Sequence, residues 1–193
     1  MNLLKSIYIS SIESGQTVFS FTDINSIYKD ANNQKIKSAL KYLVQKKEIF
    51  RISKGFYALN DRYSIYEYVN KLRTPSYISL YTVLFENGIV FQPYDSIYLM
   101  SKRSENKIVN DKTVIYKNIK DVYLLNPLGI NAINGISRAS TERAICDTIY
   151  MFGIQHFDNL LSVDFDLLKN INKDVYNDNK QILKWISQNT NQI

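Results

Sequence analysis

The stretch NNQKIKSALKYLVQK, residues 32–46, and the stretch EIFRISKGFYAL, residues 48–59, which follows one residue later, decide the fold of the first part of the chain. In its first half, apolar residues recur at the i, i+3, i+4 and i+7 spacing that predicts a helix with one buried stripe: Ile36, Ala39, Leu40 and Leu43. The opposite face carries long amide and ammonium side chains and no acid: Gln34, Lys37, Ser38, Lys41 and Gln45.

The second half predicts a β-hairpin, because two short apolar runs flank a turn that contains Gly55. A basic helix followed at once by a basic hairpin is typical of a winged helix-turn-helix. Upstream, residues 3–12 have helical periodicity, residues 19–21 predict an extended link that pairs with the hairpin, and Thr22 is the expected N-cap of a second helix. Asn32 or Asn33 is the expected N-cap of the basic helix.

In this interpretation the helix enters a DNA major groove and the hairpin tip lies on the phosphates. The residues predicted to read bases are Gln34, Lys37, Ser38 and Lys41. The residues predicted to contact phosphates are Asn33, Lys35, Arg51 and Lys54. The competing interpretation is a lysine-rich helix face that only contacts water.

Charge is concentrated in the same region. The chain has a net charge of +6, and residues 1–60 contain nine basic and four acidic residues, so that the remainder contributes only +1. Such a patch releases counterions from DNA, which is the sequence-independent source of affinity.

The rest of the composition narrows the class of protein. A single cysteine, Cys146, and a single histidine, His156, exclude an intramolecular disulfide and a zinc site built from cysteine and histidine. We expect no metal, no cofactor and no catalytic residue. No apolar run approaches the roughly 20 residues of a membrane span, and the N-terminus lacks a signal-peptide cleavage region, so the expected location is the cytoplasm away from the membrane.

A second domain is expected after a boundary at residues 60–63, so that the chain reads as a winged helix in 1–60 and a mixed α+β domain in 64–193. Helical patterns cover residues 64–72, 79–87 and 139–153, and further helices follow toward the C-terminus. Residues 97–100, 113–116 and 122–125 are β-type runs separated by polar spacers, 101–110 and 117–120. They predict a small antiparallel sheet, and the fold class is α+β.

The expected helix that begins at Ser140 or Thr141 carries a cluster of charged residues. Its members Glu142, Arg143 and Asp147 suggest either a catalytic acidic pair that holds Mg²⁺ or a structural cluster. The two acids are five residues apart, about 140° around a helix, so they do not face one metal. The spacing favours an Arg143–Asp147 ion pair, with Glu142 capping or bonding an adjacent loop.

Three segments resemble the AbiEi antitoxin family of bacterial type IV toxin–antitoxin and abortive-infection systems: residues 53–59, SKGFYAL; residues 75–89, which begin PSYISLYTVL; and residues 139–147, ASTERAICD. Thr141 departs from the usual proline and Thr82 from the usual small residue. The resemblance covers about residues 1–155. It implies a repressor that binds promoter repeats of its own operon, and a second domain that opposes a nucleotidyltransferase-like toxin, with or without stable binding to it.

Two other classes stay open. A winged helix can serve as a protein-interaction module without sequence-specific DNA binding, and a metal-dependent DNA-processing enzyme would use Glu142 and Asp147. A single winged helix buries only about 600–1,000 Å² on DNA, so the repressor interpretation predicts two or more copies on the promoter repeats.

Overall fold

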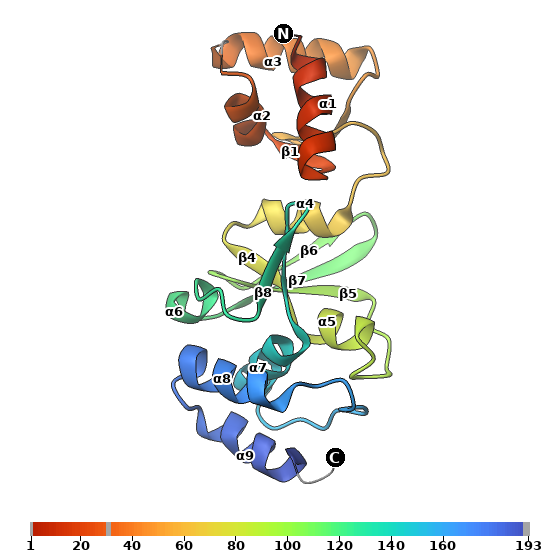
Figure 1. The fold of residues 1–193 in the computed structure, drawn as a ribbon. Coiled ribbons are helices and arrows are strands. Elements are labelled where there is room, and N and C mark those ends of the chain that lie inside the picture. The colour runs from red at the N-terminus through yellow and green to blue at the C-terminus, as the bar shows by residue number, and fades with distance from the viewer. Residues whose placement is uncertain (1, 30–31, 191–193) are drawn as a thin grey trace. The chain divides into compact units, whose positions relative to one another are not determined.

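The chain is an α+β protein with two compact units, Met1–Leu72 and Arg73–Ile193. Its structure is a computed structural model that describes residues 2–29 and 32–190 (Figure 1). Within this part, nine helices accompany a three-stranded antiparallel sheet in the first unit and a six-stranded mixed sheet in the second. The expected α+β class is therefore confirmed. The described helices include none that is long and apolar enough to cross a membrane.

The first unit alternates helices with short strands. Its elements are α1 (Leu3–Ser14), β1 (Val18–Ser20), α2 (Phe21–Ile27), α3 (Asn33–Gln45), β2 (Phe50–Ser53), β3 (Phe56–Ala58) and α4 (Ile65–Leu72). The strand order is β1-β3-β2, and both pairs are antiparallel. The hairpin is thus present where it was expected, and the extended link before α2 pairs with it through Val18 and Ala58.

Side chains cap the helices of this unit. Asn32 is the N-cap of α3, because its Oδ1 accepts the backbone N–H of Lys35 at 2.9 Å. The expected cap of α2 at Thr22 is wrong. Ser20 holds that place, since its Oγ accepts the Asp23 N–H at 3.0 Å while the Asp23 carboxylate accepts the Ser20 N–H at 2.9 Å. This reciprocal pair starts the helix before Thr22.

One hydrophobic core holds the first unit together. Its buried members come from α1, β1, α2, α3 and the residue before β2: Leu3, Ile7, Phe19, Ile24, Ile36, Leu40, Leu43 and Ile49. The predicted stripe of α3 supplies three of them, and burying each such side chain is worth about 1.5–3 kcal/mol. This burial fixes the rotation of α3 about its axis, so the polar face must point to solvent.

Helix α4 belongs with the first unit, so the chain divides after Leu72 rather than at residues 60–63. Glu67, which is 1% exposed, accepts hydrogen bonds from the N–H and Oγ1 of Thr17 at 2.7 and 2.8 Å. Lys71 donates to the Val18 carbonyl and pairs with the Asp23 carboxylate at 3.0 Å. Helical periodicity stops at residues 60–63, but these contacts, distant in sequence, tie α4 back to β1 and α2.

The sheet of the second unit is larger than expected and is not purely antiparallel. Its strands are β4 (Ser76–Ile78), β5 (Ser96–Ser101), β6 (Glu105–Val109), β7 (Lys112–Asn118), β8 (Ile130–Ile133) and β9 (Ile136–Ala139). Their order is β6-β7-β5-β4-β9-β8, with β5 parallel to β7 and β4 parallel to β9. The parallel pairs join strands that are not consecutive in the sequence, which local periodicity does not reveal.

Two segments differ from the expected strands and spacers. Residues 105–109, expected to be part of a polar spacer, form β6 at the edge of the sheet, where the charged residues Glu105 and Lys107 protect an unpaired edge. Residues 122–125, expected to be a strand, lie in and just after the short helix α6 (Asp121–Leu124), because the Lys120 carbonyl accepts the N–H groups of Tyr123 and Leu124. Tertiary context overrides the β propensity of this run.

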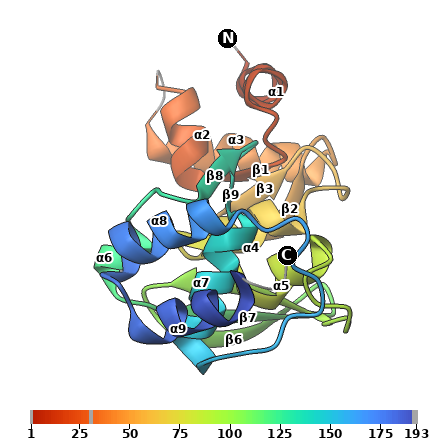
Figure 2. The same cartoon turned by 60° about the horizontal axis from the view of Figure 1, so that its bottom comes forward.

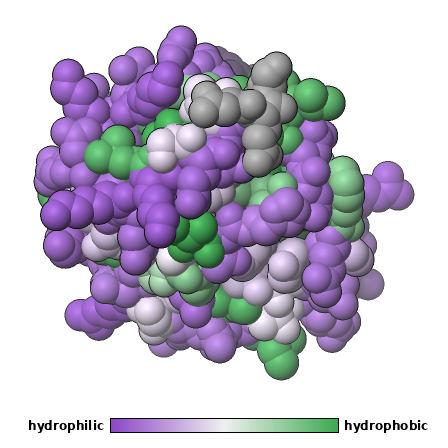
Figure 3. Space-filling view, turned by 90° about the horizontal axis from the view of Figure 1, so that it is seen from below, coloured by the Kyte–Doolittle hydropathy of each residue, from purple (hydrophilic) through white to green (hydrophobic). Residues whose placement is uncertain are grey.

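The longer helices of the second unit are α5 (Leu80–Glu86), α7 (Thr141–Phe152), α8 (Phe165–Tyr176) and α9 (Lys180–Asn189). Figure 1 shows α5 and α7 next to one face of the six-stranded sheet and α9 further from it. Helices α8 and α9 pack against α7 and against each other, and they come forward in the view of Figure 2. Figure 3 views this helical end from outside, where hydrophilic residues cover most of the surface and hydrophobic ones form small separate patches.

Candidate nucleic-acid interface

The outward face of α3 carries the residues that were predicted to read bases. Ile36 and Leu40 are fully buried, and each of the eight predicted contact residues is exposed: Asn33, Gln34, Lys35, Lys37, Ser38, Lys41, Arg51 and Lys54. Throughout residues 2–29 and 32–190, no carboxylate lies within ion-pair distance of the basic members of this set. The positive charge of this face is therefore available to an external anion.

A groove runs between α3 and the hairpin. Lys37, Lys41 and Gln45 line it from the helix, Arg51 and Tyr57 line it from β2 and β3, and the apolar side chains of Leu40 and Val44 complete it. Its volume of about 230 Å³ is below the roughly 300–1,000 Å³ of pockets that enclose a small molecule. A shallow groove with cationic walls suits one edge of an extended polyanion better than an enclosed ligand.

The hairpin is held against the start of α2. Gly55 adopts φ +84° in the turn, a conformation that glycine reaches without steric cost, and its carbonyl accepts the N–H of Phe21 at 2.8 Å. The Arg51 Nε donates to the Ser53 carbonyl at 3.4 Å, and Lys54 precedes Gly55 with an exposed side chain. The hairpin that carries Arg51 and Lys54 is thus fixed to the start of α2.

One lysine of the groove is oriented by an aromatic ring. The Nζ of Lys37 lies 5.6 Å from the ring centroid of Phe21, at cation–π distance. Phe21 is partly buried against the core of the first unit. Lys37 therefore has fewer conformations to lose on binding than a freely rotating lysine.

The groove gathers some of the predicted residues and leaves others outside it. Lys37, Lys41 and Arg51 meet there, and the remaining five are exposed without lining it. Gln45 and Tyr57 line the groove but were not assigned a contact. A regular antiparallel pairing around residues 54–55 would place Tyr57 opposite Ile52. The register shifts by one residue between Arg51 and Ser53, so that Tyr57 lies opposite Arg51, and the hairpin pattern alone does not predict this.

The second predicted cluster, Glu142, Arg143 and Asp147 of α7, is buried. Arg143 and Asp147 are each 0% exposed, and the Arg143 Nε lies 3.6 Å from Asp147 Oδ1 in the expected i, i+4 pair. The Arg143 guanidinium also donates to the carbonyls of Leu128 and Tyr123 at 2.9 and 2.6 Å. Glu142 accepts the N–H of Asp164 at 3.2 Å, at the loop contact that was expected of it.

Hydroxyl groups complete this network. Asp147 accepts hydrogen bonds from Ser79 Oγ at 2.6 Å, from Tyr77 Oη at 3.1 Å and from the hydroxyl of Tyr176. Burial raises the pKa of the Asp147 carboxyl above its usual value, and the Arg143 guanidinium and the hydroxyl donors offset this only in part. Both oxygens of the carboxylate are occupied by side chains of the protein. In the described residues, no group of three or more histidine, cysteine, aspartate or glutamate side chains is placed to hold a metal ion.

The raised pKa of Asp147 predicts a pH dependence of stability. Between the ordinary carboxyl pKa of about 3.9 and the higher value in the folded protein, the folded state binds more protons than the unfolded state. The contribution of Asp147 to the free energy of unfolding therefore falls as pH rises. We expect the unfolding free energy of the wild type minus that of Asp147→Asn, measured in urea, to decrease from pH 4 to pH 7. A difference that increases with pH would show that the charge of Arg143 outweighs burial and that the pKa of Asp147 lies below its ordinary value.

Comparison with known proteins adds no assignment to this geometry. No protein-family model matches the chain, and a search of curated proteins finds no match.

Proposed function

We propose that the protein is a DNA-binding transcriptional repressor whose first unit is a winged helix-turn-helix with α3 as the recognition helix. The element order α1-β1-α2-α3-β2-β3, with β1 paired to β3, supports this assignment. In such a module the recognition helix enters the major groove, and the β2–β3 hairpin is the wing beside it.

The observation that carries the proposal is the convergence of Lys37, Lys41 and Arg51 on one groove, where none of them has a carboxylate partner among the residues that the structure describes. A lysine-rich face that only contacts water has no reason to exclude acids or to meet an arginine of another element. A DNA duplex supplies acceptors for both the helix and the hairpin. Lys37 and Lys41 reach acceptors on base edges, while Arg51 and Lys54 lie on the phosphates.

Salt dependence tests this proposal directly. Each phosphate neutralised by a lysine or arginine contributes about −0.9 to the slope of log K against log salt concentration. With several such contacts, we expect a slope of about −4 or steeper per monomer for duplex DNA from the promoter, measured by fluorescence anisotropy between roughly 50 and 200 mM salt. A flat dependence would contradict the assignment of this face and favour a protein-interaction module.

The proposed role as an antitoxin of a type IV toxin–antitoxin system rests on the resemblance to the AbiEi family. Two of the segments that carry it are far apart in sequence but meet in the second unit. Tyr77 and Ser79 from one donate hydrogen bonds to Asp147 from the other, and Arg143 donates to Tyr77 at 3.1 Å. The shared residues thus form one buried network, which supports treating the segments as a single structural signature.

This role has a simple test. If the gene beside this one encodes a nucleotidyltransferase-like toxin, its expression alone should stop growth, and co-expression of this protein should restore it. We propose opposition to the toxin without assuming a stable complex, so copurification is not the criterion. A neighbouring gene that is harmless on its own would remove the antitoxin role and leave DNA binding by α3 untouched.

A further inference from the structure

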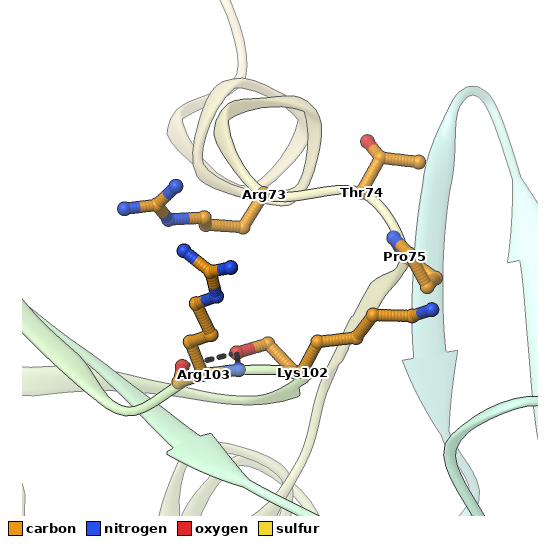
Figure 4. Close-up of a pocket in the computed structure, with 6 residues that line it drawn as sticks. Arg73, Thr74, Pro75, Lys102 and Arg103 are labelled. Carbon is orange, nitrogen blue, oxygen red and sulfur yellow. Dashed lines mark hydrogen bonds between the residues drawn. The ribbon is translucent and has the colours of Figure 1, made fainter. Parts of the chain in front are cut away.

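A second group of basic side chains, not singled out by the sequence, surrounds a hollow in the second unit (Figure 4). The hollow has a volume of about 180 Å³ and is lined by Arg73, Thr74, Pro75, Ser101, Lys102 and Arg103. These residues come from two segments, the one that enters β4 and the one that leaves β5. Figure 4 shows the guanidinium groups of Arg73 and Arg103 side by side, whereas the Lys102 ammonium extends the other way, toward Pro75.

The carboxylates nearby do not balance this charge. Glu105 pairs with Arg73, and the same carboxylate also pairs with Lys107 at 3.2 Å. Lys102 pairs with Asp121 at 3.1 Å. For Arg103, no carboxylate of the described chain lies within ion-pair distance of the guanidinium. Arg73 and Arg103 therefore lie side by side with one carboxylate next to them, Glu105, which pairs with Arg73 and is shared with Lys107. This arrangement favours an additional anion between the two guanidiniums.

The backbone that carries Arg103 is held in place before any ligand binds. Ser101, 1% exposed, donates from Oγ to the Arg103 carbonyl at 2.7 Å and accepts the Arg103 N–H at 3.3 Å. Asn118 on the neighbouring strand β7 donates from Nδ2 to the Lys102 carbonyl and from its N–H to Ser104 Oγ at 3.0 Å. Such a preorganised turn lowers the entropy cost of binding.

We propose that this hollow binds the phosphate group of a phosphomonoester through Arg73 and Arg103. A planar guanidinium forms two parallel hydrogen bonds with phosphate oxygens. Arg103 has its guanidinium available for both, whereas Arg73, whose Nε and Nη2 donate to Glu105, contributes its remaining N–H groups. The hollow is smaller than the roughly 300 Å³ at which pockets begin to enclose a drug-sized ligand. It therefore holds the phosphate and leaves the rest of the ligand in solvent. This site goes beyond the proposed repressor function, because it uses no residue of α3 or the hairpin.

The full-length protein, labelled with ¹⁵N, tests the site by titration with inorganic phosphate. We expect saturable shifts of the backbone amide signals of residues 101–104, and affinity that rises from pH 5.5 to pH 7.5 as the phosphate loses its second proton. Arg103→Gln should weaken binding at least tenfold. Arg138→Gln, which removes the same charge from a residue paired with Glu86 outside the hollow, should leave binding unchanged. The absence of saturable shifts, or equal binding by Arg103→Gln, would overturn the proposal.

The phosphate group can come from a free nucleotide or from the end of a nucleic acid, and a comparison of ligands distinguishes these two sources. In the Lys37→Glu/Lys41→Glu background, which removes the contribution of α3, a nucleoside 5′-monophosphate is compared with a 5′-phosphorylated and a 5′-hydroxyl oligonucleotide. Tighter binding of the phosphorylated strand than of the monophosphate would assign the site to a nucleic-acid end, and equal binding would assign it to a free nucleotide. If neither competes with inorganic phosphate for the amides of residues 101–104, the assignment to phosphomonoesters is wrong.

Discussion

Replacing Lys37 and Lys41 together with glutamate is expected to abolish binding to promoter DNA while the first unit stays folded. Both side chains are exposed and line the groove, so the change reverses two charges at its centre without entering the core. A good contact to a base edge discriminates by about 1–3 kcal/mol. Loss of two such contacts predicts at least about a 30-fold loss of affinity, and electrostatic repulsion of the phosphates adds to it. Fluorescence anisotropy with a labelled promoter duplex measures the loss.

A matched control exists on α9. Lys180 and Lys184 are exposed and have the same i, i+4 spacing as Lys37 and Lys41, so Lys180→Glu/Lys184→Glu makes an identical change in net charge on another helix. We expect this control to retain binding within a few-fold of the wild type at 150 mM salt, where charges beyond about 8 Å are screened. Circular dichroism checks that both variants are folded. Full binding by the α3 variant would show that α3 is not the recognition helix, and equal losses in both variants would show that net charge alone attracts DNA.

The first unit was largely predictable because its signals are local. The apolar stripe of α3, its asparagine cap and the turn at Gly55 are each encoded within a few residues, and burial of Ile36 and Leu40 then fixes which side chains face out. The groove itself was predictable only in part. It requires the register that places Tyr57 opposite Arg51, which is a property of the hairpin rather than of the helix.

The second unit was less predictable because its organising contacts join residues far apart in the chain. The pairing of β4 with β9 brings together strands about 60 residues apart, and the network of Tyr77 and Asp147 links positions 70 residues apart. Neither has a periodic signature. The basic hollow was not predicted for the same reason. Arg73 and Arg103 are far apart in the sequence, and the pairing of β4 with β5 brings them together.

Asp147→Ala is expected to destabilise the second unit by about 3–5 kcal/mol, the cost of leaving one partner of a buried ion pair alone. The substitution would leave the Arg143 guanidinium, which is 0% exposed, without its counter-charge, and the hydroxyls of Ser79, Tyr77 and Tyr176 without their shared acceptor. A loss of this size is a large part of the 5–15 kcal/mol that stabilises a typical domain. Trp185, the one tryptophan of the chain, is buried in α9. Its fluorescence therefore measures the unfolding of the second unit in urea.

Two further variants separate the charge effect from a general sensitivity of the second unit. Asp166→Ala removes an exposed carboxylate that pairs with Lys169 at the start of α8, and we expect it to cost less than about 0.5 kcal/mol. Arg143→Met/Asp147→Leu removes both buried charges, so it should be less destabilised than Asp147→Ala even though it changes more atoms. If the double variant were the less stable of the two, the hydrogen bonds of Arg143 to the Leu128 and Tyr123 carbonyls would outweigh its pairing with Asp147, and the network would act chiefly by holding those loops.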